Sequence, residues 1–135
     1  MSVPLHRLKA TDPHEDIVAA LDESGAVVVE GLLGADTLAC FNAELDPLLE
    51  DVQPERDFLN PALAWFFGKR TRHLTAVASR SRTFVDEVLC HPVFMGVCDA
   101  VLAPSCARYQ LNLAHVLDRG PGADAQILHL SLIHI

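Results

Sequence analysis

The chain is short of positive charge and has no long hydrophobic run. Ten Lys and Arg residues stand against 18 Asp and Glu residues, giving a formal net charge of −8 over 135 residues. This acidity argues against nucleic-acid or anionic-membrane partners, because both require a basic face. No segment reaches the roughly 18 consecutive apolar residues of a membrane span, and residues 1–10 lack the apolar core of a secretory signal. We therefore expect a soluble, cytoplasmic protein that binds neither nucleic acid nor membrane.

Several motifs of known chemistry are also absent. The glycines form neither G-x-G-x-x-G nor G-x-x-x-x-G-K, which excludes the common phosphate-binding loops. No G-x-S-x-G elbow supports hydrolase chemistry. The cysteines form no C-x-x-C pair, so we expect reduced, mostly buried thiols and no zinc site; they are Cys40, Cys90, Cys98 and Cys106.

What is present indicates one globular domain that begins with helices. Half of the residues are hydrophobic and 21% are charged, a composition typical of folded proteins. Asp12-Pro13 predicts a helix start, with Asp12 as the cap and Pro13 in the first turn, and Ser24-Gly25 predicts its end. The β-branched run 26–30 predicts a strand with both faces covered. A second helix is expected over 35–52, with a kink or break at Pro47.

In the second half of the chain the spacing of hydrophobic residues changes from a helical to a strand pattern. Residues 81–90 and 92–102 predict two short helices, and the aromatic segment 61–67 predicts core or lid packing. Residues 109–117 alternate as in a strand, with two predicted faces. One face would hold Tyr109, Leu111, Leu113, His115 and Leu117, and the other Gln110, Asn112, Ala114 and Val116. A turn is expected over 119–123 and another strand over 124–128.

The polar residues leave two interpretations open. The basic run 69–73 is either the solvated start of a strand or a contact for an anion. His115 lies on the apolar face of its predicted strand, so we expect a hydrogen-bonded core histidine. The other early histidines have no carboxylate at metal-binding spacing and are interpreted as structural; they are His6, His14, His73 and His91.

The segment Gly120-Pro-Gly-Ala-Asp-Ala-Gln-Ile-Leu-His129 carries a family resemblance. Its Pro-Gly turn and Gln-x-x-His ending resemble the phytanoyl-CoA dioxygenase family of Fe(II)- and 2-oxoglutarate-dependent oxygenases. The resemblance extends through most of the chain, including 26–33, 45–49 and 90–94. It implies an α+β fold in which N-terminal helices pack on the start of a double-stranded β-helix (jelly-roll, cupin-like) core, truncated at its C-terminal side.

The resemblance also implies a site and a chemistry. His129 would be one iron ligand of a 2-His-1-carboxylate triad, and Gln110, Asn112 and Gln126 would lie near 2-oxoglutarate and substrate. The implied reaction is hydroxylation of a small organic molecule, with Fe(II) as cofactor and 2-oxoglutarate as cosubstrate. The resemblance leaves the substrate and the oligomeric state open.

Position 131 departs from the family pattern. A ligand pair on one strand face is spaced i, i+2, so residue 131 should be Asp or Glu, but it is Ser131. Back-translation of residues 130–135 as CTG TCT CTT ATA CAC ATC matches the end of a common transposase sequencing adapter. We therefore expect residues 1–129 to be the N-terminal part of one oxygenase domain and 130–135 to be a non-native tail. The competing interpretation is a genuine apolar strand end.

Two other functions compete with the oxygenase. A genuine Ser131 would favour a module of the same fold that binds a small ligand without a metal. The first hundred residues alone would favour a helical interaction domain. On the oxygenase interpretation, the 135-residue chain itself is expected to bind Fe(II) weakly and to be inactive.

Overall fold

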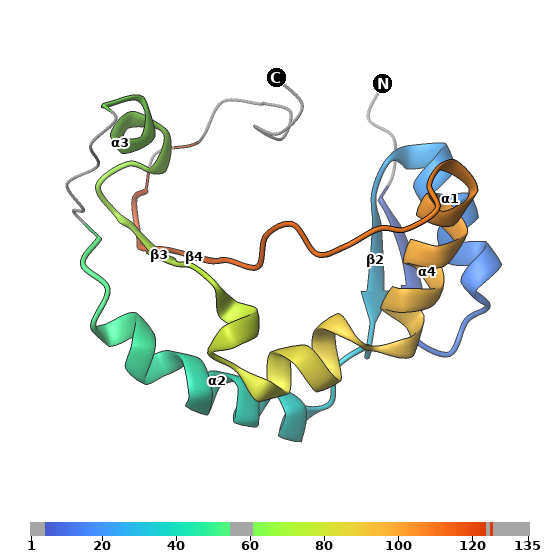
Figure 1. Ribbon diagram of the computed structural model, residues 1–135, viewed down its shortest axis with the longest axis horizontal. Coiled ribbons are helices and arrows are strands. Elements are labelled where there is room, and N and C mark those ends of the chain that lie inside the picture. The colour runs from blue at the N-terminus through green and yellow to red at the C-terminus, as the bar shows by residue number, and fades with distance from the viewer. Residues whose placement is uncertain (1–4, 55–60, 124, 126–135) are drawn as a thin grey trace.

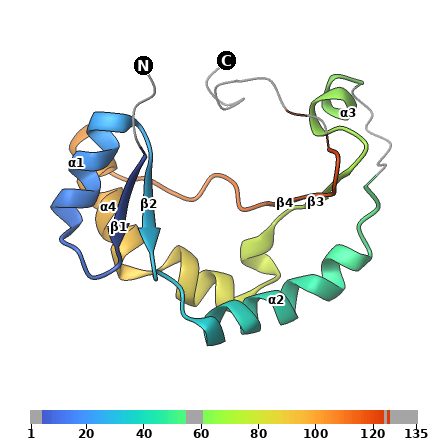
Figure 2. The same cartoon turned by 180° about the vertical axis from the view of Figure 1, so that it is seen from behind.

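The computed structural model describes residues 5–54, 61–123 and 125, which form an arch of helices and two small sheets (Figure 1). The first sheet pairs β1 (His6–Lys9) with β2 (Val27–Glu30), and the second pairs β3 (Thr71–Leu74) with β4 (Val116–Arg119). The helix α2 (Ala35–Glu50) forms the base of the arch between the two sheets (Figure 2).

The first sheet is a β-α-β unit. β1 and β2 are parallel, with His6 opposite Val27, and the helix α1 (His14–Ser24) connects them. Gly25 ends α1 in the left-handed conformation (φ 73°), and its N–H donates to the carbonyl of Leu21, as its sequence predicts. The expected strand at 26–30 is confirmed as β2, although its valines are only half-buried. β1 was not expected.

The start of α1 differs from the sequence expectation. Pro13, not Asp12, is the N-cap residue, and no side chain caps the helix. The Asp12 carboxylate instead accepts a hydrogen bond from the backbone N–H of Lys9 at 2.7 Å. Because β1 ends at Lys9, this hydrogen bond closes the turn between β1 and α1. The Asp12 carboxylate therefore stabilises the turn and does not cap the helix.

The hydrophobic core lies between α2 and the second sheet. It consists of Leu45 and Leu49 from α2 with Leu74 and Val77. Half-buried apolar side chains pack around these four: Phe41, Leu48, Val52, Phe84, Ala114 and Val116. Of the kink or break predicted at Pro47, the break is wrong, because α2 runs uninterrupted to Glu50; the kink stays a prediction. Pro47 lies in the last turn of the helix.

The remaining helical segments are short. They are α3 (Pro61–Phe67), the 3₁₀ turn η1 (Val77–Ser79), η2 (Phe84–Leu89), α4 (Pro92–Leu102) and the 3₁₀ turn η3 (Ala103–Ser105). The ordinary helix expected over 81–90 is mostly a π-helix, in which the N–H of Cys90 donates to the carbonyl of Val85. This wider turn carries the chain from the core to α4.

The strand expected over 109–117 begins only at Val116. Within the described residues, the four residues of β3 pair with the four residues of β4, and Ala114, just before β4, accepts a hydrogen bond from the N–H of Val77 instead. The core side chains come from the predicted face of Ala114 and Val116, whereas Leu111, Leu113 and Leu117 of the other predicted face are exposed. The turn after the strand is confirmed, since the N–H of Ala123 donates to the carbonyl of Gly120, but Arg119 belongs to β4.

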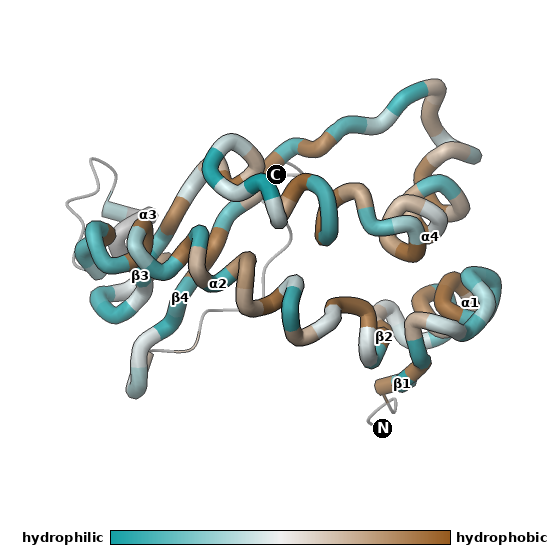
Figure 3. The backbone as a smooth tube through the Cα atoms, turned by 90° about the horizontal axis from the view of Figure 1, so that it is seen from below, coloured by the Kyte–Doolittle hydropathy of each residue, from teal (hydrophilic) through white to brown (hydrophobic). Residues whose placement is uncertain are grey.

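Seen from below, α2 runs between the β1–β2 end and the β3–β4 end of the molecule (Figure 3). No helix within the described ranges is long and apolar enough to cross a membrane. Three cysteines are exposed and Cys98 is half-buried, so the expectation of mostly buried thiols is wrong. The two sheets contradict an all-helical domain. The closed double-stranded β-helix remains a prediction.

Candidate functional site

The β3–β4 pair forms one wall of a basic hollow. The strands are antiparallel, with Thr71 opposite Arg119, and the N–H of Gly120 donates to the carbonyl of Arg70 at 2.8 Å. This pairing brings the basic run of β3 beside the end of β4. The hollow has a volume of about 440 Å³ and is lined by Pro54, Lys69, Arg70, Arg72, Asp118, Arg119, Gly120 and Pro121.

Arg72 is the best-anchored cation of the hollow. Its Nε donates to Asp118 Oδ2 at 2.7 Å, and its Nη2 forms an ion pair with the same oxygen. Its Nη1 donates to the carbonyl of Leu49 at 3.2 Å. These bonds use three of the five N–H groups of the guanidinium, and among the described residues two N–H groups are left for a ligand.

Arg70 is positioned by the turn that follows β4. Its Nη1 donates to the carbonyl of Pro121 at 2.9 Å. Gly122 allows this approach, since a Cβ at that position would lie 2.4 Å from the same nitrogen, and its φ of +72° also favours glycine. A second hollow of about 250 Å³ adjoins the turn and shares Lys69 and Arg70.

The hollow concentrates positive charge in an acidic chain. Lys69, Arg70, Arg72 and Arg119 line it, and Asp118 is its one carboxylate. Among the described residues Lys69 makes no ion pair, and its side chain is exposed. Such a cluster attracts small anions, and arginines can bind carboxylates or phosphates through paired N–H groups. Both interpretations of the basic run stay open: Lys69 and Arg70 are exposed directly before β3 begins, as in a solvated strand start, and the same side chains line a hollow that suits an anion.

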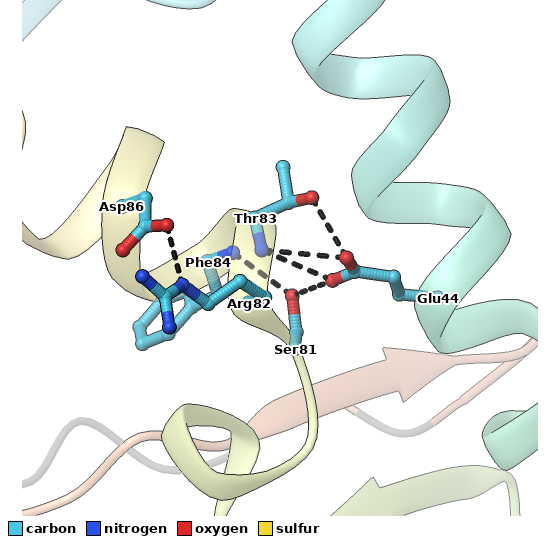
Figure 4. Close-up of polar contacts among 6 residues, drawn as sticks. All are labelled: Glu44, Ser81, Arg82, Thr83, Phe84 and Asp86. Carbon is cyan, nitrogen blue, oxygen red and sulfur yellow. Dashed lines mark hydrogen bonds and ion pairs between the residues drawn. The ribbon is translucent and has the colours of Figure 1, made fainter.

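A hydrogen-bonded cluster joins α2 to the segment that follows β3 (Figure 4). The Glu44 carboxylate accepts from the Ser81 hydroxyl at 2.5 Å and from the Thr83 hydroxyl at 2.9 Å. It also accepts from the N–H of Thr83, while Ser81 Oγ accepts from the N–H of Phe84. The hydrogen bond from Ser81 lowers the pKa of Glu44; partial desolvation opposes this shift, and the bonds from Thr83 add to it.

A second polar contact joins α4 to the chain that leads into β4. The Tyr109 hydroxyl donates to Asp99 Oδ1 at 2.5 Å. This hydrogen bond to a carboxylate is the main reason that the pKa of Tyr109 is raised to about 12. Burial raises the pKa of the nearby Cys98 thiol, and Asp99 adds to the effect. Near η2, the hydrogen bond to Asp86 raises the pKa of Arg82.

The structure describes only part of the site predicted from the resemblance. Gln110 and Asn112 are exposed and lie before β4, outside its strand pairing. Gln126, His129 and Ser131 lie outside the described residues. Within the described ranges no three His, Cys, Asp or Glu side chains come close enough together to hold a metal ion.

Two histidines that are far apart in the sequence lie side by side in the structure. His73 Nε2 and His115 Nδ1 are 2.9 Å apart, and the rings meet edge to face with centroids 4.7 Å apart. His115 is exposed, so its predicted place in the core is wrong. The predicted structural role of His91 is confirmed, because its Nδ1 accepts from the N–H of Val93 at the start of α4. Only the β3–β4 register could have indicated the pair.

Comparison with known proteins finds fungal dioxygenases. The chain is 30% identical over 139 residues to the dioxygenase cdmD of Talaromyces verruculosus, covering 95% of this chain and 45% of that protein. It is 32% identical over 127 residues to the multifunctional dioxygenase prhA of Penicillium brasilianum, covering 93% of this chain and 40% of that protein. No protein-family model matches. The chain is thus similar to fungal dioxygenases over most of its length, and it spans less than half the length of these relatives.

Proposed function

We propose that the chain is the N-terminal part of an Fe(II)- and 2-oxoglutarate-dependent dioxygenase of the phytanoyl-CoA dioxygenase type, which hydroxylates a small organic substrate. The similarity to named fungal dioxygenases over nine-tenths or more of the chain supports an oxygenase. The observation that supports 2-oxoglutarate as the cosubstrate is the basic hollow beside β3 and β4. The complete double-stranded β-helix belongs to the same proposal.

The hollow suits a dicarboxylate. 2-Oxoglutarate carries two negative charges, and the four cations of the hollow outnumber its one carboxylate. Arg72 would bind a carboxylate through its two remaining N–H groups, while Asp118 and the Leu49 carbonyl keep the guanidinium in place. Lys69 and Arg70 would add attraction from the rim. When bound, 2-oxoglutarate supplies by its oxidative decarboxylation the electrons that activation of dioxygen requires.

The described residues contain no group of three His, Cys, Asp or Glu side chains that could hold iron, and His129, the proposed ligand, lies outside them. Ser131 stands where the family has a carboxylate, and a neutral hydroxyl is a weaker ligand for Fe(II) than a charged carboxylate.

Binding of 2-oxoglutarate to this chain tests the cosubstrate part of the proposal. Titration calorimetry should show weak binding of 2-oxoglutarate, which Lys69→Gln and Arg72→Gln each weaken at least several-fold. The matched control is Arg7→Gln, because Arg7 is paired with Glu30 in the other sheet. Equal affinity of all four proteins for 2-oxoglutarate would contradict the proposed site.

Turnover tests the oxygenase itself. Expressed alone, the 135-residue chain should consume no 2-oxoglutarate. The protein encoded by a longer reading frame should consume it only with Fe(II), and should lose this activity on His129→Ala. Activity without iron, or unchanged activity in the His129 variant, would contradict the assignment.

Ser131 favours a second candidate function. If it is native, the same fold would bind a small anionic ligand without redox chemistry. Iron analysis of the full-length protein separates the two functions: the oxygenase should hold about one iron per chain, and the binding module none. Ligand affinity in an iron-free protein would support the module.

A further inference from the structure

One face of the β3–β4 pair carries two neighbouring histidines that the dioxygenase proposal does not use. His73 lies opposite Leu117 in the strand register, and His115 lies two residues before Leu117. Since alternate residues of an extended chain share a face, His73 and His115 are diagonal neighbours on one face. Leu74 and Val116, on the other face, pack on the core.

The two imidazoles present their nitrogens to one another at metal-binding separation. His73 Nε2 and His115 Nδ1 are 2.9 Å apart. Two nitrogens bound to one ion at ~2.0–2.1 Å in adjacent coordination positions lie about 2.9–3.4 Å apart. The observed separation lies at the lower end of this range, but the two nitrogens point at one another in a hydrogen bond, so the rings must turn before both can face one ion.

The surroundings hold His73 in place. The Phe67 ring packs on His73, with centroids 4.5 Å apart, and the strand pairing fixes the backbone of His73, while His115 immediately precedes β4. A hollow of about 420 Å³ lies beside His73. Its lining combines polar and apolar side chains with one cation: Leu48, Asp51, Val52, Gln53, His73, Leu74, Thr75 and Arg80. Because His115 is exposed, water can supply the further ligands of an ion.

We propose that His73 and His115 form a two-histidine binding site for a divalent transition-metal ion. Imidazole nitrogen is a preferred ligand for Ni²⁺, Cu²⁺ and Zn²⁺. In the metal-free chain one ring donates an N–H to the other, so one of the facing nitrogens carries a proton. Metal binding moves that proton to the far nitrogen of the same ring, and both facing lone pairs bind the ion. This proposal does not depend on the dioxygenase function.

Titration of the full 135-residue chain with Ni²⁺ tests the site. Ni²⁺ is the better probe, because thiolates compete for zinc and copper and three of the four cysteines are exposed. His73→Gln and His115→Gln should each lower the affinity for Ni²⁺ at least about tenfold, because chelation by two linked ligands is lost. His14→Gln, which removes an exposed histidine of α1, should leave the affinity unchanged.

A fourth variant and a second readout complete the test. Loss of Ni²⁺ binding in His129→Gln, with binding kept in His73→Gln and His115→Gln, would place the metal at His129 and overturn the proposal. Histidine NMR of the unmodified chain should show that Ni²⁺ broadens the signals of His73 and His115 first. This readout does not depend on whether a substituted chain folds. Broadening of other histidines first would overturn the proposal.

Discussion

Arg72 and Asp118 face each other across the β3–β4 pair, and the Arg72 Nε–H donates to Asp118 Oδ2 at 2.7 Å. The two residues are 46 positions apart in the sequence. The same guanidinium donates to the Leu49 carbonyl. One side chain therefore joins both strands to α2 and forms part of the wall of the basic hollow.

Arg72→Gln should lower the free energy of unfolding by about 1–2 kcal/mol, because it removes a half-exposed ion pair and a hydrogen bond to α2. Arg7→Gln should cost less than about 0.5 kcal/mol, since the side chains of Arg7 and Glu30 are 65% and 51% exposed. Urea unfolding of the variants measures both effects. Equal losses would contradict the structural role of Arg72.

Leu45→Ala should destabilise the chain by about 2–4 kcal/mol, because Leu45 is 4% exposed and packs within the central cluster. Leu38→Ala, on the same helix, is the control: Leu38 is 43% exposed, so its truncation should cost less than about 1 kcal/mol. Thermal unfolding of both variants distinguishes them. A larger effect at Leu38 would mean that α2 packs through a different face.

Glu44→Gln should destabilise the chain at neutral pH and have less effect in acid. The pKa of Glu44 is lowered by its bonds to Ser81 and Thr83, so the charged form stabilises the fold above the ordinary carboxyl range of about 4–4.5. That contribution is lost as the pH falls through the lowered pKa. Unfolding from pH 7 to pH 3 should show the variant approaching the unmodified chain. Glu50→Gln, on the exposed end of α2, controls for charge; a Glu44 effect independent of pH would contradict the account.

Tyr109 should ionise about two pH units above a free tyrosine, because its pKa is raised to about 12 by the hydrogen bond to Asp99. It is the one tyrosine of the chain, so tyrosinate absorbance reports it alone. The neutral form favours the fold, and this contribution is lost as the pH rises through 12. Asp99→Asn should move the midpoint toward about 10. A midpoint near 10 in the unmodified chain would contradict the contact.

Local signals in the sequence predicted the elements that depend on nearby residues. Gly25 ends α1 because a left-handed residue closes a helix whatever surrounds it. β1 was missed because its His-Arg-Leu-Lys sequence has little strand character, and its partner Val27–Glu30 lies a whole helix away. Residues 109–115 alternate as a strand does, but the described ladder of β3 pairs only with Val116–Arg119, and the Ala114 carbonyl accepts from Val77 instead.

In the candidate sites, too, features local in the sequence could be predicted, whereas contacts between distant residues could not. The basic run 69–73 was visible in the sequence, but its meeting with Arg119 depends on the antiparallel register. His73 and His115 lie 42 positions apart, and no spacing rule relates them. The predicted Gln126 and His129 lie outside the described residues, and they remain predictions from the family resemblance.

Sequencing of the encoding gene across codon 129, from intact genomic template, tests the dioxygenase proposal most directly. The proposal predicts Asp or Glu at codon 131, two positions after His129, and an open frame that continues to a distal His and Arg. Such a frame would supply the remaining iron ligands and the rest of the barrel. A genomic sequence that encodes Leu130-Ser-Leu-Ile-His-Ile135 and then a stop codon would contradict the iron-dependent function.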